Sequence, residues 1–354
     1  MESGMKITAG TGSVDDYISL IKMGTDEVFC GFVPYEWNEK FGNMQPLNRR
    51  EVLFYHVQIG SYSEMKILRK MQEKYGISVA VTFNALYYTK EQIICILSIM
   101  KKLMEIGFRD FIVCDVALLL RIKEEKLNCN IHISGEIGEW NRNTLEVFRE
   151  LIEDDAEISF AGQKGPRLKR IIFHRKNTLQ DMASIIKYGK KVCPELEYEA
   201  FFLNEMCHFT GGYCNSLHCD EMVHMCQMPY KLAAKKRQKF TSDLILEKWE
   251  NRWEQDWFSE EEEIVCEEEM IEVPGESGCG FCALWKLKEL GITHLKIVGR
   301  GKSVVCMEKD VENVKKGIEL LEKSISEEVY LCDMKEALFH GKCSENCYYR
   351  DTAM

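Results

Sequence analysis

Residues 78–134 read SVAVTFNALYYTKEQIICILSIMKKLMEIGFRDFIVCDVALLLRIKEEKLNCNIHIS, and this stretch decides the fold. Three short apolar runs, at Ser78–Phe83, Asp110–Cys114 and Asn130–Ser134, alternate with helical spacing over Glu91–Ile106 and Val116–Glu125. Short apolar runs are typical of buried strands, and the longer periodic segments are typical of amphipathic helices. Repeated strand-then-helix units favour parallel strands joined by helical crossovers.

The same alternation continues on both sides of this stretch. Further strands are expected at Lys6–Ala9, Glu27–Gly31, Glu157–Ala161, Arg170–His174 and Glu197–Leu203, and further helices at Val14–Met23, Asn143–Glu153 and Leu179–Tyr188. About eight such units predict an α/β fold, a TIM-like (β/α) barrel. A doubly wound open sheet is the alternative.

Composition divides the chain into four parts. Residues 1–239 are the N-terminal part of the barrel with a cysteine-rich segment, and residues 240–275 are an acidic, tryptophan-containing insertion. Residues 276–330 supply the remaining helix–strand–helix units of the barrel, and residues 331–354 form a short cysteine-containing C-terminal tail. The charge of the insertion is typical of a solvated element, although it also suits partner docking.

The length, net charge and cysteine content of the chain limit the class of protein. A chain of 354 residues with a net charge of −11 argues against a general nucleic-acid coat, so no DNA contact is expected. The start, MESGMKITAG, lacks the apolar core of a signal peptide, and no stretch approaches the roughly 18 apolar residues of a membrane-spanning helix. Sixteen cysteines in a chain of this size predict reduced thiols and a cytoplasmic location, in an anaerobic host.

Residues 199–230, EAFFLNEMCHFTGGYCNSLHCDEMVHMCQMPY, carry four cysteines at Cys207, Cys214, Cys219 and Cys226. Thiolates this dense, separated by a glycine pair, indicate a soft metal or an iron–sulfur cluster. The alternative is four unrelated thiols.

A second thiol pair, Cys279 and Cys282, forms a CxxC motif at the start of a predicted helix. This motif is compatible with zinc, redox or cluster chemistry. Zinc is the main rival metal, bound through cysteines together with the histidines of the cysteine-rich segment, which are His208, His218 and His224.

Polar residues follow several of the predicted strands. They are Asn84, Asp115, Glu136, His174 and Arg175. In a parallel barrel the chemistry gathers at the carboxyl ends of the strands, so these residues are the candidate catalytic set, facing the cysteines at the barrel mouth. The structural alternative for each is a turn or helix-cap residue.

At these residues the chain resembles the collagenase-like peptidases, family thirty-two of the unassigned (U) peptidases. The run Glu199-Ala-Phe201, Met206-Cys207 and Gly212-Tyr-Cys214 is similar to the family signature. Cys226-Gln-Met-Pro-Tyr230 resembles the C-R-L-P-Y motif, and LKIVGRGKS at Leu295–Ser303 resembles L-K-I-E-G-R-x-K-S.

The resemblance implies a barrel with a [4Fe–4S] cluster on Cys207, Cys214, Cys226 and Cys282, with Cys219 and Cys279 as alternates. It also implies oxygen-independent hydroxylation or a related redox modification of a small aromatic or RNA substrate, and a paralogous heterodimer partner. Arg175 aligns with an arginine at a strand end in the family and is expected to hold an anionic group. The alternatives are a peptidase, as the family name says, and a non-catalytic metal-binding subunit of a paralogous pair.

Overall fold

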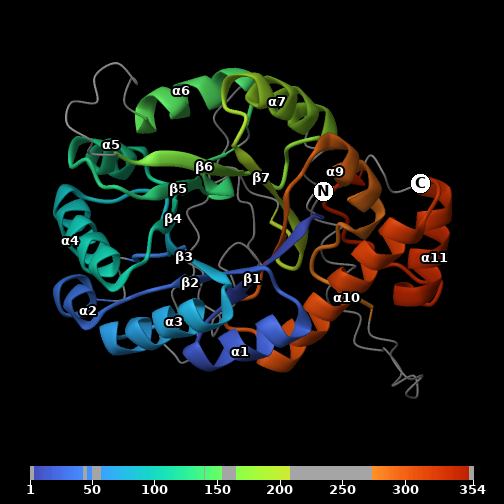
Figure 1. Cartoon of the computed structure of the whole chain (residues 1–354), viewed down its shortest axis with the longest axis horizontal. Helices are drawn as coiled ribbons and strands as arrows, with labels where there is room; N and C mark the ends of the chain where they lie inside the picture. The colour runs from blue at the N-terminus through green and yellow to red at the C-terminus, as the bar shows by residue number, and fades with distance from the viewer. Residues whose placement is uncertain are drawn as a thin grey trace, which may run out of the picture. The chain divides into compact units, whose positions relative to one another are not determined.

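The computed structural model describes residues 4–42, 46–49, 57–138, 140–153, 165–207 and 273–350. Its strands form a closed barrel in the order β1 to β8, with every neighbouring pair parallel and β8 closing on β1 (Figure 1). The strands are β1 Lys6–Thr11, β2 Glu27–Gly31, β3 Ser78–Phe83, β4 Asp110–Val113, β5 Asn130–Ile133, β6 Arg167–Ile172, β7 Glu197–Leu203 and β8 His294–Ile297. The predicted TIM-like barrel is confirmed.

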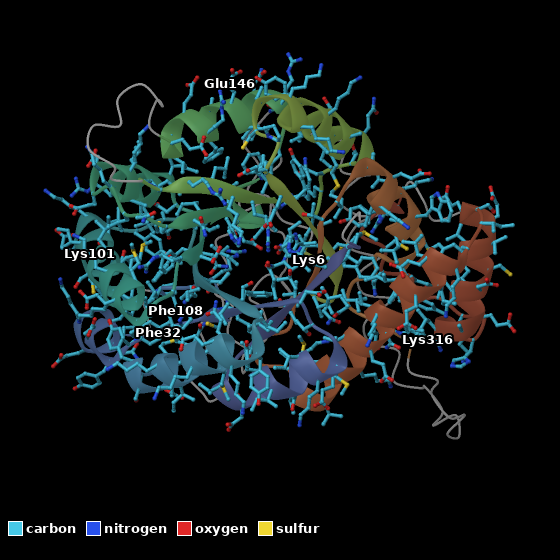
Figure 2. All side chains as sticks on the ribbon, in the orientation of Figure 1. Lys6, Phe32, Lys101, Phe108, Glu146 and Lys316 are labelled. Carbon is cyan, nitrogen blue, oxygen red and sulfur yellow. The ribbon has the colours of Figure 1, made fainter. Side chains whose placement is uncertain are left out.

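Helices surround this barrel on its outer side (Figure 1). They are α1 Val14–Met23, α2 Tyr35–Phe41, α3 Tyr62–Tyr75, α4 Lys90–Ile106, α5 Val116–Glu124, α6 Arg142–Ile152, α7 Leu179–Val192, α9 Leu284–Leu290, α10 Val304–Lys323 and α11 Glu327–Phe339, with 3-10 turns η1 Gly135–Ile137 and η5 Phe281–Ala283. Several of them begin at a capping box, in which a hydroxyl such as that of Ser61 or Thr178 accepts from a backbone N–H of the first turn. Charged residues, among them Lys101, Glu146 and Lys316, cover the outer helices (Figure 2).

The structure differs from the sequence prediction in the bounds of some elements, and it adds the helices α2 and α3 between β2 and β3. The strand expected at Arg170–His174 begins earlier, at Arg167, and ends at Ile172, so His174 lies beyond the sheet. Helix α10 begins at Val304, where the side chain of Ser303 caps it. The strand expected at Glu157–Ala161 and residues 240–272 of the insertion lie outside the described residues.

The interior of the barrel holds a buried ion-pair network as well as apolar side chains. Arg170 is 1% exposed and reaches carboxylates on two strands: Glu27 at 2.7 Å, Glu197 at 2.6 Å and Glu199 at 2.9 Å. Burial alone would raise the pKa of the Glu27 carboxyl, but His294 and Arg170 hold that pKa well below its ordinary value. The network neutralises the charges that the strands place inside the barrel.

The chain after β8 returns to the outside of the barrel. Helix α10 packs against α1 and β1, and α11 packs against α10. The predicted boundary between the last barrel units and the tail, at residue 330, falls inside helix α11. The first residues of the predicted tail therefore form the second half of that helix. Within the described residues, no helix is both long and apolar enough to cross a bilayer.

Candidate functional site

Two arginines share one carboxylate at the mouth of the barrel. Arg175, which follows β6, donates from Nη1 to Oε1 of Glu136 at 2.6 Å. Arg49 lies on the other side, with Nε 3.2 Å from Oε2 of the same carboxylate. The three side chains are 7%, 9% and 12% exposed for Arg175, Arg49 and Glu136, so the charges interact with little screening by water. One carboxylate is thus paired with two guanidinium groups.

The position of Arg175 is fixed on its remaining sides by aromatic rings. Its guanidinium carbon lies 3.9 Å from the ring centroid of Phe201, a cation–π contact, and it is hydrogen-bonded with Tyr348. Burial by itself would lower the pKa of Arg175, but the Glu136 carboxylate reverses this and raises the pKa above its ordinary value. Arg175 therefore stays charged at every physiological pH.

A cavity of about 290 Å³ opens beside Arg175. Its described lining comes from the turn between β6 and α7, the start of α7, the chain after β7 and the tail: Arg175, Lys176, Asn177, Thr178, Leu179, Met206, Cys207, Cys347, Tyr348, Tyr349 and Arg350. Three of these residues are cationic, and none of the described lining residues carries a carboxylate. The cavity is thus locally basic in a chain whose net charge is −11.

The other predicted catalytic residues serve the architecture of the strand ends. Asp115 is the N-cap of α5 and accepts from the N–H of Leu118 at 2.6 Å and of Tyr88 at 3.3 Å. Burial raises the pKa of its carboxyl. Asn84 accepts the backbone N–H of Arg49 at 3.1 Å and so orients the segment that carries the second guanidinium.

His174 lies directly before Arg175 and is buried. Its ring Nδ1 accepts from the backbone N–H of Lys176 at 3.2 Å. The backbone N–H of His174 donates to the side-chain oxygen of Asn177 at 3.2 Å. These bonds define the turn that presents Arg175 to Glu136. The structure therefore brings two of the five predicted residues, Arg175 and Glu136, into direct contact.

The predicted cluster ligands are only partly described. Cys207 is half-buried, lines the basic cavity, and is close enough to Arg175 to interact with it electrostatically. Cys214, Cys219 and Cys226 lie outside the described residues, as do the three histidines of that segment, His208, His218 and His224.

Cys279 and Cys282 line a second, smaller cavity together with the tail cysteines Cys343 and Cys347. Burial, and then the neighbouring thiols, raise the pKa of Cys282, and Lys335 opposes them. Burial raises the pKa of the Cys279 thiol to about 12. Cys347 lines both cavities, so the two sites are neighbours.

The tail supplies residues that the sequence reasoning missed. Tyr349 donates its hydroxyl to the carbonyl of Phe201 at 2.7 Å, and the Tyr348 hydroxyl donates to the carbonyl of Asn204. Both tyrosines are buried and pack at the carboxyl end of β7. Two adjacent tyrosines directly after Cys347 were the available signal, because this residue type buries its ring when its hydroxyl finds an acceptor.

One group of ligand-type side chains lies at the opposite end of the barrel. Within the described part of the chain, donor atoms of Glu27, Glu197 and His294 lie within 4.8 Å of one another. Arg170 already occupies their centre, with Nη2 2.6 Å from Glu197 and 2.8 Å from Nε2 of His294. A guanidinium at this point repels a cation, so this group is a structural ion-pair network.

Comparison with known proteins identifies a family. The family model described as Peptidase family U32 matches residues 12–353, nearly the whole chain. No curated protein matches the chain.

Solved structures similar to this chain include one described as the U32 peptidase Mk0906, which is 11% identical with a TM-score of 0.39 over 57% of this chain and 71% of that chain. A designed cube-shaped protein cage is 9% identical with a TM-score of 0.40, covering 95% of this chain and 78% of its own. A 3-keto-L-gulonate-6-phosphate decarboxylase from Vibrio cholerae is 13% identical with a TM-score of 0.29, covering 56% and 78%. The assignment of a family rests on the family model alone.

Proposed function

The chain belongs to Peptidase family U32, and we propose that it is an iron–sulfur enzyme that carries out oxygen-independent hydroxylation or a related redox modification. Its substrate is an aromatic group that bears an anion, either a small molecule or a nucleotide of RNA. The observation that carries this proposal is the basic cavity at the barrel mouth, in which Cys207 and Arg175 share one wall.

The charge of the cavity favours an anionic substrate. Arg175, Lys176 and Arg350 are the described ionisable cations of its lining, and the N-terminus of α7 lies at the same wall. A helix N-terminus and cationic side chains both favour a phosphate or a carboxylate. The volume of about 290 Å³ is close to the lower limit of roughly 300 Å³ for ligand sites, which suits one ring with its anionic substituent.

The thiols of the cysteine-rich segment suit iron better than a hard metal, because thiolate sulfur is a soft ligand. By resemblance, Cys207, Cys214, Cys226 and Cys282 would hold the cluster, with Cys219 as the alternate for the third ligand and Cys279 as the alternate for the fourth. When bound, a [4Fe–4S] cluster supplies one-electron chemistry that no side chain provides.

The described residues would orient the substrate. Arg175 presents a planar guanidinium suited to bidentate recognition of a carboxylate or phosphate. Glu136 and Phe201 hold that guanidinium in one orientation, so little side-chain entropy is lost when an anion binds. Lys176 and Arg350, both exposed, raise the local concentration of anions.

Anaerobic purification with measurement of iron and acid-labile sulfide tests the cluster, and fluorescence anisotropy with a short single-stranded RNA tests the anion site. We expect Cys207→Ser to lose iron and sulfide, and the matched Cys306→Ser, whose thiol is exposed on α10, to keep both. RNA binding should persist in Cys207→Ser and fall in Arg175→Lys. Wild-type protein without iron and sulfide would overturn the proposal.

A further inference from the structure

We propose that Tyr348, in the C-terminal tail, is a positioning residue of the anion site: its hydroxyl and the Glu136 carboxylate together fix the orientation of the Arg175 guanidinium. The tail thereby sets the affinity of the basic cavity for anions, although almost half of the chain separates Tyr348 from Arg175. The inference rests on the role of Arg175 in the proposed function and uses no property of the cluster.

Tyr348 and Arg175 meet beside the ring of Phe201. The tyrosine hydroxyl is hydrogen-bonded with the guanidinium, and both residues line the basic cavity. The centroid of the Phe201 ring lies 3.9 Å from the guanidinium carbon and 6.2 Å from the centroid of the Tyr348 ring. Because a guanidinium carries donors only, the Tyr348 oxygen is the acceptor of this bond.

The proton of the Tyr348 hydroxyl is directed elsewhere. The hydroxyl donates to the backbone carbonyl of Asn204. Burial raises the pKa of this hydroxyl to about 12, so it keeps its proton at neutral pH. With the proton directed at Asn204, the oxygen presents a lone pair to Arg175. The hydroxyl therefore accepts from the guanidinium in one fixed orientation.

The carbonyl of Asn204 is itself held in place. Asn204 is 2% exposed and has a φ of 69°, a left-handed conformation that persists where the surroundings enforce it. Its backbone N–H donates to the carbonyl of Gly278 at 2.9 Å. Its side-chain Nδ2 donates to the carbonyl of Val298 at 3.1 Å and to the carboxylate of Asp310 at 2.7 Å. These bonds fix the acceptor that orients the Tyr348 hydroxyl.

Backbone pairing holds the tail against the same loop. The N–H of Tyr348 donates to the carbonyl of Cys279 at 2.9 Å, and the N–H of Cys279 donates to the carbonyl of Asn346 at 2.8 Å. A Cβ at Gly278 would lie 2.9 Å from the hydroxyl oxygen of Tyr348, so the hydroxyl fits because residue 278 has no side chain. The ring and the hydroxyl of Tyr348 are thus positioned independently of any ligand.

This arrangement prepares Arg175 for an anion. Without the Tyr348 hydroxyl, one guanidinium N–H loses its acceptor, and the side chain has to be ordered when the anion binds. The entropy of ordering one long side chain corresponds to about a three- to tenfold loss of affinity.

Tyr348→Phe tests the inference, with Tyr17→Phe as the matched control. Both variants keep the ring and remove one buried hydroxyl that donates to a backbone carbonyl, but the Tyr17 hydroxyl bonds Ile77, at the other end of the barrel. Fluorescence anisotropy with a short single-stranded RNA should show binding weakened about three- to tenfold in Tyr348→Phe and unchanged in Tyr17→Phe. Equal affinities, or tighter binding by Tyr348→Phe, would overturn the inference.

The same comparison in an Arg175→Lys background separates positioning from a general structural effect. Because Tyr348 acts through the Arg175 guanidinium, Tyr348→Phe should weaken RNA binding no further once that guanidinium is gone. An equal loss in both backgrounds would overturn the inference. If Arg175→Lys itself leaves the RNA affinity unchanged, the proposed anion site fails and the inference with it. If Arg175→Lys weakens binding and Tyr348→Phe does not, only the inference fails.

A spectroscopic measurement on the wild type keeps the test decisive if Tyr348→Phe fails to fold. In protein labelled with ¹⁵N-arginine, the Nη resonances of Arg175 are assigned by their absence in Arg175→Lys. They should be separate in the wild type and in Tyr17→Phe, because the hydrogen bonds restrain rotation about the Nε–Cζ bond, and they should average in Tyr348→Phe. A single averaged Nη resonance in the wild type would overturn the inference.

Discussion

Arg175 and Glu136 form a 2.6 Å ion pair across the mouth of the barrel, although they lie 39 residues apart, Glu136 in η1 after β5 and Arg175 after β6. Glu136 also contacts Arg49, so one carboxylate orients two guanidinium groups. Both guanidinium groups are therefore held in a largely buried group. This is what an enzyme needs in order to hold an anion without rearranging first.

Glu136→Gln should separate the stability of this group from its affinity for anions. The amide removes the charge that compensates Arg49 and Arg175, so the protein should lose about 3 kcal/mol of unfolding free energy. The remaining cations should bind RNA more tightly than the wild type does. Urea unfolding and fluorescence anisotropy measure the two effects. Weaker RNA binding by a folded Glu136→Gln protein would contradict the assigned role.

The exposed cations of the cavity should contribute to the salt dependence of RNA binding. Lys176→Gln and Arg350→Gln should each weaken binding and reduce the slope of log affinity against log salt by about 0.7, the value for one phosphate contact on a single strand. Lys187→Gln, exposed farther along α7, is the matched control and should leave the slope unchanged. Equal slopes in all three variants would place the RNA elsewhere.

Gly135 brings the end of β5 against the ring that supports Arg175. A Cβ at this position would lie 2.8 Å from Cε2 of Phe201 and 2.9 Å from the carbonyl oxygen of Phe173. Gly135→Ala should therefore lower the unfolding free energy by about 1–3 kcal/mol. It should also displace the Phe201 ring from its contact with the Arg175 guanidinium and so weaken RNA binding. Gly60→Ala has nothing within 4 Å of the added carbon and is the control. Thermal unfolding and anisotropy of both variants test this; equal stabilities would refute the close contact.

Glu199 should make the barrel sensitive to acid. Burial would raise the pKa of its carboxyl, but Lys296 and Arg170 outweigh it and lower the pKa from 4.5 to about 2. A lowered folded-state pKa adds stability above the unfolded value, so this contribution is lost as the pH falls from about 4.5 to about 2. Glu199→Gln should reduce the pH dependence of the unfolding free energy between about pH 4.5 and about pH 2. At neutral pH it should lower the unfolding free energy by about 3 kcal/mol.

The control for this titration is Glu146→Gln, on the exposed face of α6, which should follow the wild-type curve. The measurement is urea unfolding at a series of pH values. If Glu199→Gln and Glu146→Gln gave the same curve, the buried network would not be the acid-sensitive element.

The barrel was predictable from sequence because its signal is local. Each strand is a short apolar run, and most helices carry an apolar stripe, so β3, α4, β4, α5 and β5 follow from spacing. Helix α3 was missed, although Ser61 and Glu64 form a capping box at its start. Its apolar residues are sparse, and packing against α1 and α4 supplies much of its stability.

The site was predictable only where residues directly follow strands. Arg175 and Glu136 stand at strand ends, so the barrel topology alone places them at one mouth. Arg49 lies between β2 and α3, outside the regular strand–helix alternation, and no periodicity marks it. Tyr348 and Cys347 reach the mouth through tertiary packing of the tail, and sequence spacing holds no information about that contact.

The most direct test of the central claim is the product. Nucleosides and small aromatic metabolites from host cells that lack this chain are compared by mass spectrometry with those from cells that express the wild type or Cys207→Ser, all grown without oxygen. The account predicts one aromatic species that gains an oxygen atom, or an equivalent redox change, with the wild type alone. Identical profiles in all three strains, with the protein expressed and its iron and sulfide present, would contradict it.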